Sequence, residues 1–289
     1  MKINIFTVIV GNAVCNAECP YCVSRMTPNC GVGTKPIEPN FRNFEIACCF
    51  AKNSNVSTVL LTGKGEPTLF SNLVSQYVRR IHEHGFPFIE LQTNGILLSE
   101  NKSNFLSKVE KWYLDGLTTV SISIVHYDEK RNAEIFRPGK PYYFWHLVDC
   151  LHQIGLSVRI TCTLVKGYID NVDDISRLAN VCQLKDVEQL TVREVSRPDN
   201  KQDIKTTNYV DEHNTVGLCN QMQTVLQKHF AKLLLKLPHG GLVYDWNGQN
   251  ICLANCLTDS TDQNDIRQLI FFPDGHLRYD WRYPGAIIL

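Results

Sequence analysis

Short apolar segments alternate with longer amphipathic ones through the first two thirds of the 289-residue chain. The interior apolar segments are rich in β-branched residues, which is typical of parallel strands covered on both faces. The predicted strands are residues 3–10, 56–62, 87–92, 118–124, 157–165 and 187–195. Helices are predicted between them at residues 42–53, 71–84, 101–113, 142–154 and 172–183. Six strand–helix units in series predict an α/β fold, a partial (βα)6 TIM-like barrel.

The pattern changes near residue 200, so we expect two units, residues 1–200 and 201–289. Residues 198–208 are polar and predicted to be irregular, and a helix is predicted at 214–236, where apolar residues recur at three- and four-residue steps. Short strands are predicted at residues 242–246, 250–253, 266–272 and 276–281, the last two joined by a turn at Pro273-Asp274-Gly275. The second unit is therefore expected to be a helix with a small β-hairpin module.

The composition disfavours several kinds of partner. The 29 Lys and Arg residues balance the 29 Asp and Glu residues, so no overall charge favours nucleic acid or an anionic membrane. No apolar run reaches the roughly 18 residues of a membrane span, and Lys2 begins a strand-like segment rather than a signal peptide. We therefore expect a cytoplasmic protein, in which grouped cysteines indicate metal or catalytic sites. Scattered cysteines are expected to be small core residues, and these are Cys48, Cys49, Cys150, Cys162 and Cys182.

Three grouped cysteines, Cys15, Cys19 and Cys22, follow the first predicted strand directly. Their C-x3-C-x2-C spacing supplies three thiolates from one loop, whereas a structural zinc site or an ordinary electron-transfer cluster takes four protein ligands. Three thiolates on a four-iron cluster leave one iron open to a small molecule. A zinc site with Cys30 as the fourth ligand is the alternative.

Polar residues and glycines follow the later strands. In a parallel barrel the loops after the strands meet at one mouth, so we expect these residues to lie near the three cysteines. They are Gly65, Glu66 and Pro67 after the second strand, Thr93 and Asn94 at the third, Ser121 and Ser123 in the fourth, and Thr161 in the fifth. Gly65 allows a close approach of the backbone, and hydroxyl groups both donate and accept hydrogen bonds.

Together these motifs resemble the radical S-adenosylmethionine (SAM) enzymes. The resemblance covers residues 1–196 and is nearest to the branch of the molybdopterin-cofactor GTP cyclase. It implies a [4Fe–4S] cluster on Cys15, Cys19 and Cys22 as the catalytic centre, with SAM on the open iron. The implied SAM contacts are Tyr21, Gly65, Glu66, Pro67, Thr93, Asn94, Ser121, Ser123 and Thr161. Glu66 would bind the methionine amino group, and the serines would hold the ribose.

The chain departs from the family pattern in two places. Lys64 stands where the first glycine of the Gly-Gly-Glu-Pro segment usually lies, and it either contacts substrate or faces solvent. The C-terminal unit resembles the SPASM or twitch modules that hold extra clusters, but the cysteine expected after the hairpin is missing. We expect a degenerate module whose aromatic residues close over substrate, or an auxiliary cluster on Cys219, Cys252 and Cys256.

The resemblance implies reductive cleavage of SAM to a 5′-deoxyadenosyl radical, which takes hydrogen from a substrate. Candidate substrate contacts are Lys64, His126, Arg131, Arg193 and Glu194. Only 14 residues precede Cys15, which favours a small molecule, such as a nucleotide or phosphorylated sugar, over a peptide. The electron donor would be a flavodoxin or ferredoxin. Alternatives are a peptide-modifying enzyme, a glycyl-radical enzyme activase and a non-catalytic zinc or iron–sulfur protein.

Overall fold

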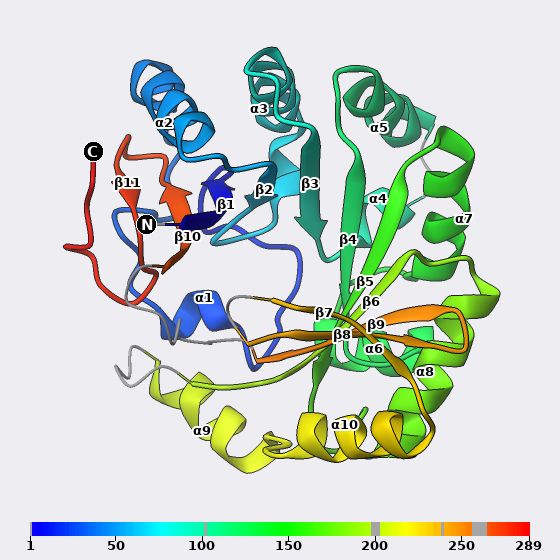
Figure 1. Cartoon of the computed structure of the whole chain (residues 1–289). Coiled ribbons are helices and arrows are strands. Elements are labelled where there is room, and N and C mark those ends of the chain that lie inside the picture. Colours follow the sequence, from blue (N-terminus) through cyan, green and yellow to red (C-terminus); the bar gives the residue numbers. More distant parts are fainter. Residues whose placement is uncertain (1, 101–102, 198–202, 238–239, 256–264) are drawn as a thin grey trace.

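A curved sheet with helices on its outer side dominates the computed structural model, which describes residues 2–100, 103–197, 203–237, 240–255 and 265–289 (Figure 1). The central strands are β1 (Lys2–Ile9), β2 (Thr58–Thr62), β3 (Phe88–Thr93), β4 (Thr119–Ile124), β5 (Ser157–Leu164) and β6 (Gln189–Glu194). They pair in chain order, all parallel. The predicted α/β fold and partial barrel are confirmed.

Five helices connect these strands along the convex side of the sheet in Figure 1. They are α2 (Phe41–Asn53), α3 (Ser71–Glu83), α5 (Ser103–Leu114), α7 (Phe144–Ile154) and α8 (Val172–Leu184). Four shorter elements follow strand ends: α1 (Val23–Met26), η1 (Pro67–Phe70), α4 (Ile96–Ser99) and α6 (Glu129–Phe136). The sequence reasoning missed these short elements because each has too few residues to show a period.

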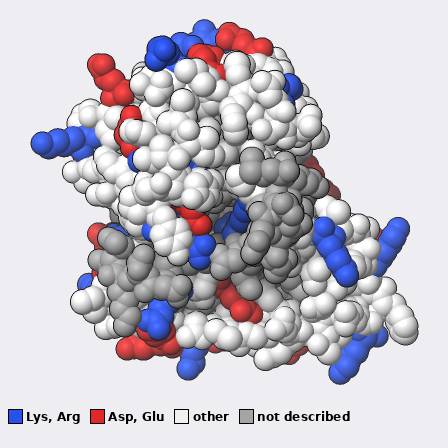
Figure 2. Space-filling view, turned by 60° about the vertical axis from the view of Figure 1, so that its left-hand side comes forward, with Lys and Arg blue, Asp and Glu red and all other residues white. Residues whose placement is uncertain are grey.

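The core lies between the sheet and these helices. Alternate strand residues such as Val59, Leu91 and Val120 are fully buried on the helix side, because successive side chains of a strand point to opposite faces. The concave face carries polar residues instead. The surface on the side of β10 and β11 is hollowed near its centre, with basic and acidic side chains inside the hollow (Figure 2).

The helix predicted at 214–236 is wrong in extent. The segment contains α9 (Ile204–His213), α10 (Leu218–Lys228) and the strand β7 (Lys232–Lys236). Asp203 starts α9 within the stretch predicted to be irregular, because its carboxylate accepts the backbone N–H of Thr206 at 3.1 Å. Gly217, with φ of +88°, separates α9 from α10, and the backbone of β7 pairs with the next strand.

The C-terminal strands join the barrel sheet at both of its edges. They are β8 (Leu242–Trp246), β9 (Gln249–Asn255), β10 (Asp265–Phe271) and β11 (Leu277–Arg278). β9 pairs parallel with β6, β10 pairs parallel with β1, and the β10–β11 hairpin forms as predicted. The eleven strands have the order β11-β10-β1-β2-β3-β4-β5-β6-β9-β8-β7. The strands expected in an appended module are therefore continuous with the main sheet, while the division at residue 200 stays a prediction.

No helix in the described ranges has the length and apolar character needed to cross a membrane.

Candidate active site

The cysteine loop leaves β1 through a tightly packed turn. Gly11 has φ of +72°, and a Cβ there would lie 2.2 Å from the ring of Phe70, so only glycine fits. The side chain of Asn12 is buried, accepts the N–H of Val14 at 2.9 Å and donates to the carbonyl of Thr34 at 2.9 Å. Ala13 donates to the carbonyl of Gly33 at 2.8 Å. The backbone ahead of the cysteines is therefore fixed from two sides.

The three cysteines of this loop lie close enough to influence one another electrostatically. Burial raises the pKa of the Cys15 and Cys19 thiols, and the neighbouring sulfurs add to that rise. The N–H of Ala17 lies 3.4 Å from Cys15 Sγ, and the amide of Asn94 lies 3.8 Å from it. A bound cation, such as iron in a cluster, would favour the thiolate form of these sulfurs.

The cysteine loop supplies three thiols, and the zinc alternative needs Cys30 as a fourth ligand. Cys30 packs in a separate apolar cluster with Ile9, Val32, Ile270 and Phe272. The zinc alternative stays a prediction, because Lys64 lies near both Cys30 and Cys22. Within the described residues no three His, Cys, Asp or Glu side chains are already gathered as metal ligands.

Glu66 is buried at the end of β2 and is held by four hydrogen bonds. Its Oε1 accepts from Thr68 N at 3.0 Å, Thr68 Oγ1 at 2.7 Å and Thr93 Oγ1 at 2.6 Å. Its Oε2 accepts from the N–H of Asn94 at 2.9 Å. Burial raises the pKa of this carboxyl, and the hydrogen bonds oppose the rise. A positively charged amino group beside it would favour the carboxylate form.

Three loops lock together around this carboxylate. Glu66 N donates to the carbonyl of Val14 at 3.0 Å, which joins the second strand's loop to the cysteine loop. A Cβ on Gly65 would lie 2.0 Å from that same carbonyl oxygen. The side chain of Asn94 donates to Asn16 Oδ1, inside the cysteine motif, at 2.7 Å. The predicted meeting of Cys15, Glu66 and Asn94 at one mouth agrees with this geometry.

The sequence profile of the radical SAM superfamily matches residues 9–182. The chain belongs to the radical SAM superfamily. The matched range begins at the end of β1 and includes the cysteine loop and the loop of Glu66. Members of this superfamily use SAM for radical chemistry.

Solved radical SAM structures share the fold. SuiB from Streptococcus suis, bound to S-adenosylmethionine, has a TM-score of 0.61 and 15% identity over 96% of this chain, which spans 60% of SuiB. Methylornithine synthase (PylB) has a TM-score of 0.56 and 14% identity, covering 91% of this chain and 74% of its own. AdoMet-bound anSMEcpe has a TM-score of 0.50 and 14% identity, covering 79% and 62%. No curated protein matches the sequence.

Lys64 of this radical SAM chain does not face solvent, so that alternative is wrong. The side chain is buried, and its Nζ donates to Thr27 Oγ1 at 2.6 Å. The ammonium group lies 5.5 Å from the centre of the Trp281 ring. Burial lowers the pKa of Lys64 to about 8. The residue thus joins the helix that follows the cysteines to the C-terminal segment.

Ser121 and Thr161 meet on the concave face of the radical SAM barrel. Both side chains are buried, and their hydroxyl oxygens lie 3.0 Å apart. Ser123 is two residues after Ser121 on the same face of β4. It lies opposite Thr161 in the β4–β5 pairing and is half-buried. Tyr21 is buried near Cys19 and Cys22. Burial raises the pKa of its hydroxyl, and the charges of these two cysteines raise it further.

His126 and Arg131 form a separate group after β4. His126 Nδ1 accepts the N–H of Asp128 at 2.8 Å, and its Nε2 lies 3.5 Å from Arg131 Nη1. Burial and the Arg131 charge lower the pKa of His126, which keeps the imidazole neutral near pH 7. Arg131 also donates to the carbonyl of Gly167 and lies over the ring of Tyr168. These contacts hold the pair within the protein.

The candidates at the end of β6 have different surroundings. Glu194 Oε1 accepts the N–H of Cys219 at the start of α10 at 2.7 Å, so this carboxylate stabilises a helix end. Arg193 Nε is buried and has no hydrogen-bond partner among the described residues.

The auxiliary cluster stays a prediction. Cys219 is buried, with its thiol 3.9 Å from the carbonyl of Ala254, and Cys252 is half-buried on β9. Cys256 lies outside the described residues. Of the scattered cysteines, Cys49 is exposed on α2, so its expected place in the core is wrong.

Sequence reasoning missed several residues of the site. Tyr142 is buried and donates to the carbonyl of Asn94 at 2.6 Å, and no local pattern marks it. Thr27 and Trp281, the neighbours of Lys64, come from distant parts of the chain. Asn16 and Thr68 lie inside or beside recognised motifs, so their position was the one available signal.

Proposed function

We propose that this chain is an enzyme that cleaves SAM reductively and takes a hydrogen atom from a small-molecule substrate. The observation that carries the proposal is the buried Glu66, bonded through its backbone to the cysteine loop and through its carboxylate to Asn94. A buried carboxylate near the Cys15 thiol suits a ligand with a positively charged amino group that also reaches a metal. When bound to the three thiolates, a [4Fe–4S] cluster with one open iron supplies the electron that cleaves SAM.

The residues of the chain would position SAM and exclude water. Cys15, Cys19 and Cys22 would hold the cluster, and Glu66 would orient the amino group of SAM. Ser121 and Thr161 offer paired hydroxyls on the concave face for the ribose. Thr93 and Asn94 fix the carboxylate of Glu66 in one orientation, which aims the reactive end of SAM. The substrate would then lie inside the barrel, with an external protein reductant supplying the electron.

The test is the reductive cleavage of SAM by the anaerobically reconstituted protein. We expect about four irons per chain, a visible absorption that changes on addition of SAM, and 5′-deoxyadenosine formation under reduction. Cys19→Ala should abolish this product. Cys49→Ala, which replaces an exposed cysteine on α2, is the matched control and should keep it. Undiminished turnover by Cys19→Ala, or one zinc per chain in place of iron, would overturn the assignment.

A further inference from the structure

The concave face of the sheet holds a layered set of polar side chains. On β5 and β6, Ile160 and Val192 are fully buried on the helix side. The residues that alternate with Ile160 along β5 and with Val192 along β6 therefore point to the inside of the barrel. In register order across β5, β6 and β9, one layer holds Arg159 and Gln189, the next Thr161, Thr191 and Cys252, and the next Thr163, Arg193 and Ala254. These three layers thus contain Arg159 and Arg193, two layers apart.

The first arginine, Arg159, is neutralised within the protein. Its Nη1 lies 2.9 Å from Oε2 of Glu90, a residue of β3 that is buried on the same face. Its Nε donates to Gln189 Oε1 at 2.8 Å. These partners offset the cost of taking part of the half-buried Arg159 side chain out of water.

The Nε of the second arginine, Arg193, lacks the kind of hydrogen bond that Arg159 Nε makes. Its Nε is buried without a partner in the part of the chain that the structure describes. The adjacent carboxylate of Glu194 is bonded to the backbone of Cys219 instead. The hydroxyl of Ser196, three residues after Arg193, is also buried without a partner among the described residues. The register places Arg193 on the mouth side of Thr161, opposite Thr163 on β5.

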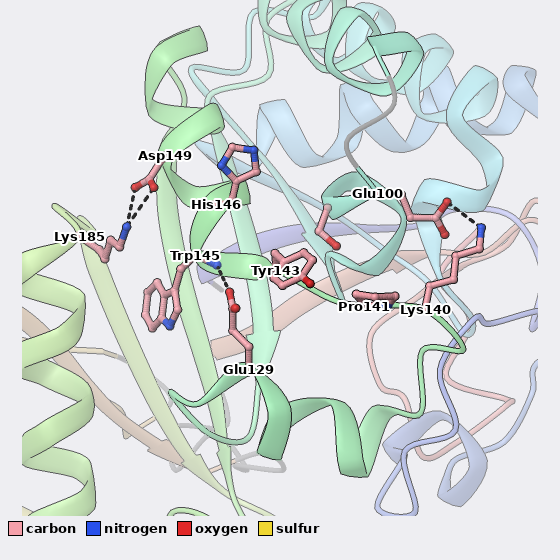
Figure 3. Close-up of a pocket in the computed structure, with 10 residues that line it drawn as sticks. Glu100, Glu129, Lys140, Pro141, Tyr143, Trp145, His146, Asp149 and Lys185 are labelled. Atoms are coloured by element: carbon pink, nitrogen blue, oxygen red, sulfur yellow. Dashed lines mark hydrogen bonds and ion pairs between the residues drawn. The ribbon is translucent and has the colours of Figure 1, made fainter.

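A cavity elsewhere in the molecule shows the contrast. It measures about 690 Å³ and lies among helices beside α7 (Figure 3). Its charges are already paired, Lys140 with Glu100 at 3.2 Å and Lys185 with Asp149 at 3.0 Å, and Glu129 accepts the N–H of Trp145. A charged ligand would have to break these pairs. The barrel interior has the opposite character, a buried donor without an acceptor.

We propose that Arg193 binds an anionic group of the substrate, a carboxylate or a phosphate, inside the barrel. This inference rests on the proposed function, since it takes the barrel interior to be the substrate site. The planar guanidinium presents its N–H groups in a fork that matches both anions. In the β5–β6 register Arg193 is one layer beyond Thr161, the partner of Ser121, so the rest of the substrate would extend towards the expected position of SAM.

Equilibrium binding of simple anions to the reconstituted protein tests this without any knowledge of the substrate. Inorganic pyrophosphate represents a phosphorylated substrate and citrate represents a carboxylate, and both are titrated by calorimetry. We expect Arg193→Gln to lose one binding event, or to weaken it at least tenfold, for one of the two anions. Arg193→Lys should weaken it less, because the charge stays while the fork is lost. Arg177→Gln, on the exposed side of α8, is the matched control and should bind as the wild type does.

Two further measurements separate the substrate site from other roles. The affinity for SAM should stay within twofold in Arg193→Gln; a tenfold loss with unchanged binding of both anions would assign Arg193 to SAM and overturn the proposal. The melting temperature should not fall, because no described residue loses a partner. A fall of several degrees would show a structural ion pair and overturn the proposal equally. Absence of SAM cleavage in the wild type would instead refute the proposed function, since anion binding does not depend on cleavage.

Discussion

Lys64 and Glu66 place opposite charges on the same short loop, and both side chains are buried. Glu66 is surrounded by donors from Thr68, Thr93 and Asn94, whereas Lys64 has a single hydroxyl, that of Thr27, as its recorded acceptor. The two groups therefore have different consequences. The carboxylate is fixed and ready for a cationic ligand, while the ammonium carries an unfavourable cost of desolvation.

The cost of burying Lys64 predicts a pH dependence of stability in the metal-free protein. Burial lowers its pKa from 10.5 to about 8. Below pH 8 both folded and unfolded chains hold the proton, and the cost is complete. Between about pH 8 and 10.5 the unfolded chain binds more protons, so stability rises with pH. In urea unfolding, the free energy of unfolding of the wild type should therefore rise relative to that of Lys64→Met over this range. The expected rise is up to about 3 kcal/mol, at about 1.4 kcal/mol per pKa unit.

The comparison with Lys64→Met removes the ammonium group, and with it the charge that lowers the pKa of the neighbouring Cys30 thiol. A stability difference that stays constant from pH 7.5 to 10.5 would contradict the buried, pKa-lowered lysine. The burial itself was beyond sequence reasoning, which left solvent and substrate equally open for Lys64. Its acceptor Thr27 and its aromatic neighbour Trp281 are 37 and 217 positions away along the chain, and no local pattern reports such contacts.

At the scale of elements, the loops that follow β1 and β2 determine the geometry of the candidate site. The loop after β1 and the loop after β2 are joined by the hydrogen bond from Glu66 N to the carbonyl of Val14. That bond requires the backbone at Gly65 to pass directly beside Val14. Glycine is the residue that allows such an approach. The junction couples the cysteines proposed to hold the cluster to the residue proposed to orient SAM.

Gly65→Ala should therefore disable cluster binding while leaving the barrel folded. The added Cβ would lie 2.0 Å from the Val14 carbonyl oxygen, which is main chain and has no flexible end to move aside. We expect reconstituted Gly65→Ala to retain less than about a tenth of the wild-type iron, with near-native circular dichroism. Gly33→Ala is the control, because a Cβ there meets nothing within 4 Å. Full iron loading of Gly65→Ala would contradict the close junction.

Sequence reasoning performed well for elements with a clear period and a local signal. A continuous apolar run predicts a buried parallel strand, as at residues 118–124 and 157–165. The motifs at Cys15 and Glu66 were recognised because their residues are close together in the sequence. The segment 214–236 was misread because Leu233, Leu234 and Leu235 continue an apolar pattern that also suits a helix. Pairing with β8 decides the strand there, and that pairing is a tertiary fact.

At the scale of the whole molecule, residues far apart in sequence complete one sheet. β10 covers the edge of β1, and β9 covers the edge of β6. An uncovered edge strand exposes unpaired backbone groups, so the C-terminal segment protects both sides of the barrel. Phe271 of β10 is fully buried, with its ring 5.3 Å from that of Phe44 on α2. The sequence suggested a boundary at residue 200 because the strand–helix alternation stops there, but composition does not show which edges later strands will join.

This arrangement predicts a single cooperative unfolding transition that depends on the C-terminal segment. Phe271→Ala should lower the free energy of unfolding by about 3–5 kcal/mol, the usual cost of emptying a fully buried aromatic site. Phe230→Ala, at a ring that is 94% exposed, should change it by less than about 0.5 kcal/mol. Denaturation followed by far-ultraviolet circular dichroism and by tryptophan fluorescence should give coincident curves for both variants. Two separate transitions, with only one of them shifted by Phe271→Ala, would show that residues 1–200 and 201–289 fold as independent units after all.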